Sequence, residues 1–171
     1  MQQSRIVFKC RSFEVAEEQF LSNSHPITRN IVKHPGAVVI LPRLSVNRYI
    51  LLKQFRHALR QTILEFPAGT LNPGEAPDLC AHRELIEETG FAGGSWKHLG
   101  ILYPAPGFCD EIQHLYFASE LQKTAQQLDE DEIIEPVELS RQEIENAIAN
   151  GELRDAKSIG IFTKALLAGL I

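Results

Sequence analysis

The sequence predicts a single α/β or α+β sandwich with a mixed sheet, preceded by a small N-terminal β element. Strand-like runs alternate irregularly with helical segments, and 171 residues are close to the roughly 150 residues of one domain. Hydrophobic residues make up 44% and charged residues 23% of the chain, which excludes a disordered or low-complexity protein. We assign residues 1–35 to the N-terminal β element, which we expect to be a dimerisation segment, and residues 36–171 to the main domain.

Predicted strands dominate the N-terminal half. Residues 5–20 alternate apolar with polar side chains, which is typical of one or two half-exposed strands, and a polar break follows at 22–26. The apolar runs 36–42 and 49–55 are joined by a short turn and predict a hairpin. A short strand is expected at 62–66, and the loop after it is dense in proline and glycine.

The C-terminal half mixes strands and helices. The clearest helix spans residues 77–89, because Pro77 suits a first helical turn and Gly90 a helix terminus. The other predicted elements are strands at 98–103, 112–119 and near 136–139, a helix from a Ser140 cap to Gly151, and a last amphipathic helix from about Lys157.

Charge and cysteine content exclude several classes of protein. The net charge of −5 lacks the Lys/Arg surplus of a general nucleic-acid binder, so we expect no nucleic-acid partner. Cys10, Cys80 and Cys109 are odd in number and form no CxxC pair, which argues against disulfides and zinc and suits a reducing compartment. The first 14 residues contain no apolar stretch as long as that of a signal peptide, so we expect no secretory signal, and the apolar run 37–41 is too short to span a bilayer. We therefore expect a cytoplasmic protein without a membrane partner.

Three glutamates share one face of the predicted helix 77–89. Glu84, Glu87 and Glu88 stand at i, i+3 and i+4, within an arc of roughly 100°. Like charges so placed repel, and pairing of Arg83 with Glu87 would leave at least two carboxylates without a counter-charge. Hard divalent cations, Mg²⁺ or Mn²⁺, are a natural counter-charge for oxygen ligands. A solvated acidic helix face is the alternative.

The neighbouring residues decide between these interpretations. Gly69, Glu75 and the run RELIEETGF at 83–91 resemble the signature of the Nudix hydrolases at every fixed position. The resemblance implies a Nudix α/β/α sandwich with a mixed sheet. It also implies metal-dependent hydrolysis of a nucleoside diphosphate linked to another group.

The resemblance assigns roles to the residues of this signature. Glu84 and Glu88 would be the principal metal ligands, and Glu87 a further ligand or a water-mediated contact. The carbonyl of Ala68 would supply one more oxygen, and Arg83 would orient the carboxylates. Mg²⁺ is the expected cofactor, with Mn²⁺ as a possible substitute.

The resemblance extends to the ADP-ribose pyrophosphatase branch of the family. Pro106, 16 residues after Gly90, stands where that branch carries a proline. The expected reaction is hydrolysis of ADP-ribose to AMP and ribose 5-phosphate. GDP-mannose and other nucleoside diphosphate sugars are the main alternative substrates. A catalytically idle nucleotide sensor and an RNA 5′-end pyrophosphohydrolase are less favoured. The similar segments are 54–56, 64–69, 104–108, 110–111 and 128–132.

Several residues outside the signature are candidates, each with an alternative. Arg56 is a phosphate or ribose contact, or a surface arginine. Glu65 contacts a ribose hydroxyl, or only pairs with Arg56. Glu111 faces the metal, or is a charge at a strand edge. In the acidic run 129–132, the resemblance favours Glu130, then Glu132, as the base that accepts a proton from the attacking water.

Relatives of this branch are typically homodimers that exchange N-terminal strands and share the nucleoside pocket. A homodimer is therefore expected here. Phe8, Phe13, Phe20 and Arg29 are candidates for base stacking or phosphate contact, and ordinary packing is their alternative. Pro106 is expected to lie beside the substrate.

Overall fold

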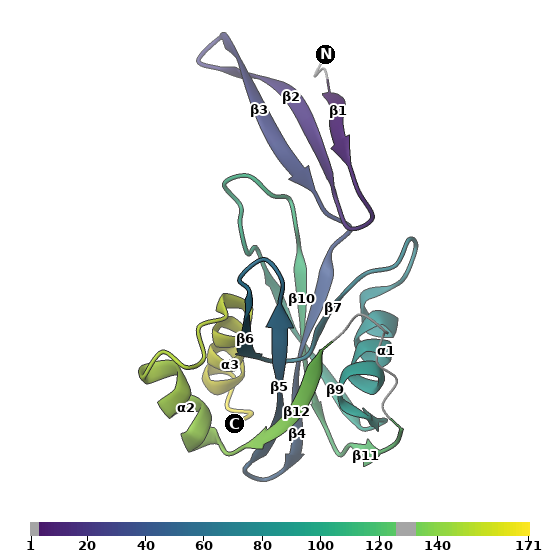
Figure 1. The fold of residues 1–171 in the computed structure, drawn as a ribbon, viewed down its shortest axis with the longest axis vertical. Coiled ribbons are helices and arrows are strands. Elements are labelled where there is room, and N and C mark those ends of the chain that lie inside the picture. The colour runs from purple at the N-terminus through teal and green to yellow at the C-terminus, as the bar shows by residue number, and fades with distance from the viewer. Residues whose placement is uncertain (1–3, 126–132) are drawn as a thin grey trace.

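The described part of the chain, residues 4–125 and 133–171 of a computed structural model, has a layered α/β body from which a separate sheet projects (Figure 1). The helices are α1 (Pro77–Thr89), α2 (Arg141–Ala149) and α3 (Ala156–Leu167). The strands are β1 (Ser4–Lys9), β2 (Glu14–Ser22), β3 (His25–Lys33), β4 (Ala37–Ser45), β5 (Arg48–Arg56), β6 (Gln61–Glu65), β7 (Ala68–Thr70), β8 (Phe91–Ala92), β9 (Ser95–Leu102), β10 (Gln113–Ser119), β11 (Gln122–Lys123) and β12 (Ile134–Leu139).

A mixed sheet forms the centre of the body. Its main path runs β12-β5-β4-β10-β9, with β6 paired to β5 and β7 paired to β4. The β4–β10 pair is parallel, and the other neighbours are antiparallel. The central strand β4 is buried on both faces, which explains its unbroken apolar run. The predicted mixed sheet is confirmed.

The helices cover opposite faces of this sheet. Alternate side chains of a strand point to opposite faces, and β4 follows this rule. Val38 and Ile40 pack with the buried side chains of α1, whereas Val39 and Leu41 belong to the core that includes residues of α2 and α3. The α/β/α layering therefore matches the sequence-based expectation.

Local sequence explains the helix boundaries. Gly90 ends α1 in the left-handed region with φ 70°, and its N–H donates to the Ile86 carbonyl. Ser140 caps the start of α2, as predicted, and Glu143 completes a capping box with it. Asp155 caps α3 by accepting a hydrogen bond from the Ser158 N–H. Among the helices of the described residues, none is long and apolar enough to cross a membrane.

The N-terminal strands form a sheet of their own, in the antiparallel order β1-β2-β3 (Figure 1). The predicted break at residues 22–26 is wrong, because β3 already begins at His25. Only Asn23 and Ser24 form the turn, with φ of 49° and 65°. His25 and Pro26 already pair with β2, and Pro26 is tolerated because β3 is an edge strand.

The end of β3 is tied to the loop that joins β9 and β10. The Val32 N–H donates to the Phe108 carbonyl at 2.8 Å, and the Asp110 N–H donates to the Val32 carbonyl at 3.0 Å. The Asp110 carboxylate accepts from the His34 N–H at 2.9 Å and lies 3.1 Å from Lys33 Nζ. The projecting sheet is thus anchored to the loop that contains Pro106.

Candidate active site

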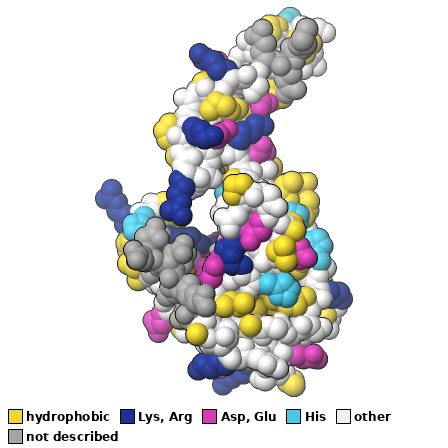
Figure 2. Space-filling view, turned by 90° about the vertical axis from the view of Figure 1, so that its right-hand side faces the viewer, with side chains coloured by type: hydrophobic (Ala, Val, Ile, Leu, Met, Phe, Trp, Pro, Cys, Tyr) yellow, Lys and Arg dark blue, Asp and Glu magenta, His cyan; other side chains and the backbone are white. Residues whose placement is uncertain are grey.

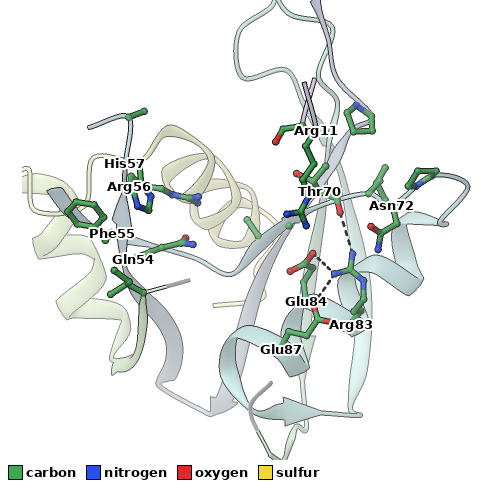
Figure 3. Close-up of a pocket in the computed structure, with 18 residues that line it drawn as sticks. Arg11, Gln54, Phe55, Arg56, His57, Thr70, Asn72, Arg83, Glu84 and Glu87 are labelled. Carbon is green, nitrogen blue, oxygen red and sulfur yellow. Dashed lines mark hydrogen bonds and ion pairs between the residues drawn. The ribbon is translucent and has the colours of Figure 1, made fainter. Parts of the chain in front are cut away.

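A cleft of about 990 Å³ is lined by residues of the β1–β2 turn, the end of β5, β7 and α1 (Figure 3). The end of β5 supplies Arg56 to its lining, and the β1–β2 turn supplies Arg11. Further lining residues lie in the Nudix-like signature or directly before it: β7 provides Ala68 and Gly69, and α1 provides Arg83, Glu84 and Glu87.

Arg83 is surrounded by three carboxylates. Its Nη1 donates to Glu84 at 2.6 Å and to Glu87 at 2.9 Å, while Nε and Nη2 donate to the two oxygens of Glu75 at 2.9 and 2.8 Å. Nη2 also donates to the Thr70 carbonyl at 3.3 Å. These bonds occupy all five N–H groups of the guanidinium, so Arg83 positions acids and has no donor left for a ligand.

This geometry corrects the expectation that Arg83 leaves at least two of the three glutamates uncompensated, because it contacts both Glu84 and Glu87. The Arg83 hydrogen bonds are also the largest cause that lowers the pKa of Glu75 from 4.5 to about 2. In turn, the hydrogen bonds that Arg83 donates to Glu75, and then the charge of Glu84, raise the pKa of Arg83 against the effect of burial.

Glu88 and Gly69 lie where α1 contacts β7. Glu88 is only 2% exposed, and its carboxylate accepts a hydrogen bond from the Ala68 N–H at 2.9 Å. A Cβ on Gly69 would lie 1.9 Å from Glu84 Oε1, which is far inside van der Waals contact. Only a glycine at position 69 therefore lets the Glu84 side chain lie against β7.

The donor chemistry fits a hard divalent cation. Glu84, Glu87, Glu88 and the Ala68 backbone offer only oxygen ligands, as Mg²⁺ and Mn²⁺ prefer. In the conformation of residues 4–125 and 133–171, no three acidic, histidine or cysteine side chains are grouped as a metal site. Arg83 lies between Glu84 and Glu87 instead, so a cation and the guanidinium compete for the same carboxylate oxygens.

Arg56 and Glu65 form a second charged group at the cleft. Arg56 Nε and Nη2 donate to the two oxygens of Glu65 at 2.6 and 2.7 Å, and Glu65 is 1% exposed. Lys157 of α3 binds the same carboxylate, and its Nζ lies 3.0 Å from Asp155. Burial favours the neutral form of Glu65, but Arg56 and Lys157 together hold its pKa below the usual range. Glu65 therefore pairs with Arg56 and Lys157, and its contact with a ribose hydroxyl stays a prediction.

The other candidate residues lie elsewhere. Phe8 is exposed on β1, with its ring centroid 6.0 Å from that of Phe13, and Arg29 is exposed on β3. Pro106 is exposed in the β9–β10 loop, and Glu111 accepts a hydrogen bond from Gln113 at 2.9 Å. Within the single described chain, the cleft lining includes none of these residues. Glu130 and Glu132 lie outside the described residues.

Sequence reasoning assigned no role to Lys157, Arg11 or His57, and Gln54 was noted only as part of the similar segment 54–56. Lys157 reaches Glu65 across 92 positions, and only the need of a buried carboxylate for counter-charges could have pointed to it. Figure 3 shows Arg11 on one side of the cleft and Gln54, Arg56 and His57 on the other. Arg11 reaches this position because the β1–β2 turn faces the body, which no local pattern reveals.

Comparison with known proteins places this cleft in a family. A family model described as the NUDIX domain matches residues 32–159, well over half of the chain. The chain belongs to the Nudix family. The match confirms the family predicted from the signature, and with it the enzyme class of a Nudix pyrophosphohydrolase.

Individual relatives refine this Nudix assignment. The chain is 41% identical over 144 residues to an ADP-ribose pyrophosphatase of Bacillus subtilis (strain 168), covering 83% of this chain and 78% of the relative. It is 40% identical over 141 residues to a methanol dehydrogenase activator of Bacillus methanolicus, covering 81% and 76%. A solved ADP compounds hydrolase shares the fold, with a TM-score of 0.83 at 21% identity over 99% of this chain and 95% of that one.

Proposed function

We propose that this Nudix protein hydrolyses the pyrophosphate bond of ADP-ribose to give AMP and ribose 5-phosphate. The observation that carries the proposal is the cleft in which the signature carboxylates Glu84 and Glu87 and the cation Arg56 line one space. A diphosphate needs cationic contacts as well as metal ligands, and this lining supplies both. The 41% sequence identity to the ADP-ribose pyrophosphatase of Bacillus subtilis supports the choice of substrate.

The proposed metal is Mg²⁺, with Mn²⁺ as a substitute. Glu84, Glu88 and the Ala68 carbonyl would hold it, with Glu87 as a further ligand or a contact through water. When bound, the ion neutralises the diphosphate and makes water a better nucleophile. Arg83 keeps Glu84 and Glu87 on the cleft side of α1 through its hydrogen bonds.

The remaining chemistry falls to side chains around the metal ligands. Arg56 binds the diphosphate with the N–H groups that Glu65 does not occupy. The oxygen of one water attacks a phosphorus atom, the bridging P–O bond breaks, and the water's proton passes to a carboxylate. We assign that base role to Glu130. Glu132 and Glu111 are the alternatives, and a Gln variant of each identifies the base by a loss of kcat.

The N-terminal segment 1–35 is proposed to join two subunits of a cytoplasmic homodimer. Its support is the exposure of apolar side chains on the small projecting sheet, where Figure 2 shows hydrophobic groups at the surface. They include Ile6, Val7 and Phe8. In such a dimer, Phe8 and Arg29 face the partner's cleft, and Pro106 borders the substrate.

A substrate panel tests the proposed function. Purified protein with Mg²⁺ is given ADP-ribose, GDP-mannose, UDP-glucose, a dinucleotide or a 5′-triphosphorylated RNA, and phosphatase-sensitive product is measured. We expect kcat/KM for ADP-ribose to exceed the others by about tenfold or more. A higher value for GDP-mannose would move the assignment to that sugar nucleotide. Absence of hydrolysis with every substrate would favour a nucleotide sensor.

A further inference from the structure

The first turn of α3 contacts the segment that leads into the cleft at two neighbouring residues. Lys157 binds the Glu65 carboxylate, and the Ser158 hydroxyl accepts a hydrogen bond from the Phe66 N–H at 2.7 Å. Ser158 is fully buried and Lys157 is largely buried. Glu65 and Phe66 are followed by Pro67 and then by β7. The first turn of α3 therefore holds the residues just before β7.

Asp155 joins these two contacts into one unit. Its Oδ2 accepts hydrogen bonds from the Ser158 N–H at 3.0 Å and from the Ser158 hydroxyl at 2.5 Å, and it lies 3.0 Å from Lys157 Nζ. The N-cap of α3 thereby fixes both side chains that reach Glu65 and Phe66. We call Asp155, Lys157 and Ser158 the α3 clamp.

Glu65 transmits the position of the clamp to the cleft. One carboxylate oxygen binds Arg56 Nε, and the other binds both Arg56 Nη2 and Lys157. Two parallel bonds fix the plane of a guanidinium as well as its distance. Within the described residues, Arg56 Nη1 donates no hydrogen bond, and Arg56 lines the cleft. The direction in which the Arg56 Nη1 N–H groups point therefore depends on where Lys157 holds Glu65.

The charges explain why Lys157 matters for orientation. Glu65 is buried beside two cations, and Lys157 has Asp155 as its second partner. Without Lys157, one Glu65 oxygen would keep only Arg56 Nη2 among these partners, so the carboxylate could turn together with Arg56. The pair would stay charged but would lose its fixed point on α3.

We propose that Lys157 is a positioning residue for substrate binding, which acts through Glu65 to aim Arg56 at the diphosphate. This inference rests on the proposed function and adds a residue outside the Nudix signature to its machinery. It predicts that loss of Lys157 weakens binding of the diphosphate more than it slows the chemical step.

Kinetics of three variants test the inference. Lys157→Met removes the ammonium at similar length, and Lys157→Arg restores a cation. Lys164→Met is the matched control on the same helix, where Lys164 Nζ binds only the Leu99 and Ile101 carbonyls among described partners. We expect Lys157→Met to raise KM for ADP-ribose by about tenfold to a hundredfold with kcat nearly unchanged. Lys157→Arg should recover most of the affinity, and Lys164→Met should keep the wild-type KM.

A second measurement does not depend on catalysis. Hydrogen exchange at the Arg56 Nε–H, followed by NMR and assigned by its loss in Arg56→Lys, reports directly on the bond to Glu65. We expect faster exchange in Lys157→Met and wild-type exchange in Lys164→Met. If Lys157→Met is unfolded in a thermal melt, Lys157→Gln, which keeps an N–H donor, is used for both measurements.

The outcomes separate the inference from the proposed function. Hydrolysis of ADP-ribose by the wild type with an unchanged KM in Lys157→Met would overturn the positioning role alone. A fall in kcat and melting temperature that Lys157→Arg does not rescue would assign Lys157 to stability only. No hydrolysis by the wild type would overturn the proposed function. In that case, unchanged Arg56 Nε–H exchange in Lys157→Met would separately overturn the positioning role of Lys157.

Discussion

Replacement of Gly69 by alanine tests how closely β7 must approach α1. The added Cβ would lie 1.8 Å from Glu84 Cδ and 2.4 Å from Glu84 Cγ, so the glutamate side chain has to leave its position. The φ of Gly69 lies outside the left-handed region, so the clash is the cause of any effect.

The size of the effect follows from the contact that Glu84 loses. Its carboxylate lies 2.6 Å from Arg83 Nη1, and the two side chains are only 12% and 29% exposed. Loss of a hydrogen bond between charged groups costs about 1.5–3 kcal/mol. We therefore expect the free energy of unfolding to fall by about 1–3 kcal/mol. Displacement of a principal metal ligand should lower kcat/KM by about a hundredfold or more.

Urea denaturation and hydrolysis of ADP-ribose with Mg²⁺ measure the two effects on the same variant. Gly107→Ala is the stability control, because a Cβ there would meet no atom within 4 Å. Its unfolding free energy should stay within about 0.5 kcal/mol of the wild type. Wild-type activity of Gly69→Ala at low Mg²⁺ would refute the argument, since Glu84 could then leave its position without consequence.

Three further predictions concern the acids and the projecting sheet. Glu88→Gln should lower turnover by orders of magnitude while the fold persists in circular dichroism, and near-normal rates at saturating Mg²⁺ would contradict its role as a ligand. Because Arg83 lowers the pKa of Glu75 from 4.5 to about 2, the stabilisation is fully present above pH 4.5 and is lost as the pH falls toward 2. Urea titrations should thus show Glu75→Gln less stable than the wild type near neutral pH, with a difference that shrinks toward pH 2; a constant difference would refute the linkage. Light scattering should detect a dimer at micromolar concentration, and a fully active monomer would exclude a pocket shared through residues 1–35.

Sequence patterns predicted those parts of the molecule that depend on neighbouring residues. Pro77 and Gly90 bracket α1 because a first turn tolerates a missing N–H and a glycine accepts the left-handed terminus. Glu84, Glu87 and Glu88 share a helix face because of the helical repeat alone. The hairpin of β4 and β5 likewise follows from two apolar runs and a short turn.

Contacts between distant segments could not be read in this way. The composition around Asn23 and Ser24 indicated a break, but the pairing of β3 with β2 continues directly after the turn. Arg83 was expected to pair with Glu87 alone. It also contacts Glu84, and the loop before α1 brings Glu75 to it as well. The contact of Lys157 with Glu65 exists only because the fold brings α3 beside β6, 92 positions away in the sequence.

The hydrogen bonds between Val32 and the loop at Phe108 and Asp110 have a consequence for anyone who shortens or recombines this chain. A truncation at residue 35, the boundary suggested by sequence, would leave the Phe108 carbonyl and the Asp110 N–H without their backbone partners and would remove Lys33 from Asp110. The position of the β9–β10 loop therefore depends on the N-terminal sheet. A chimera that swaps substrate preference between relatives should exchange the two segments as one cassette.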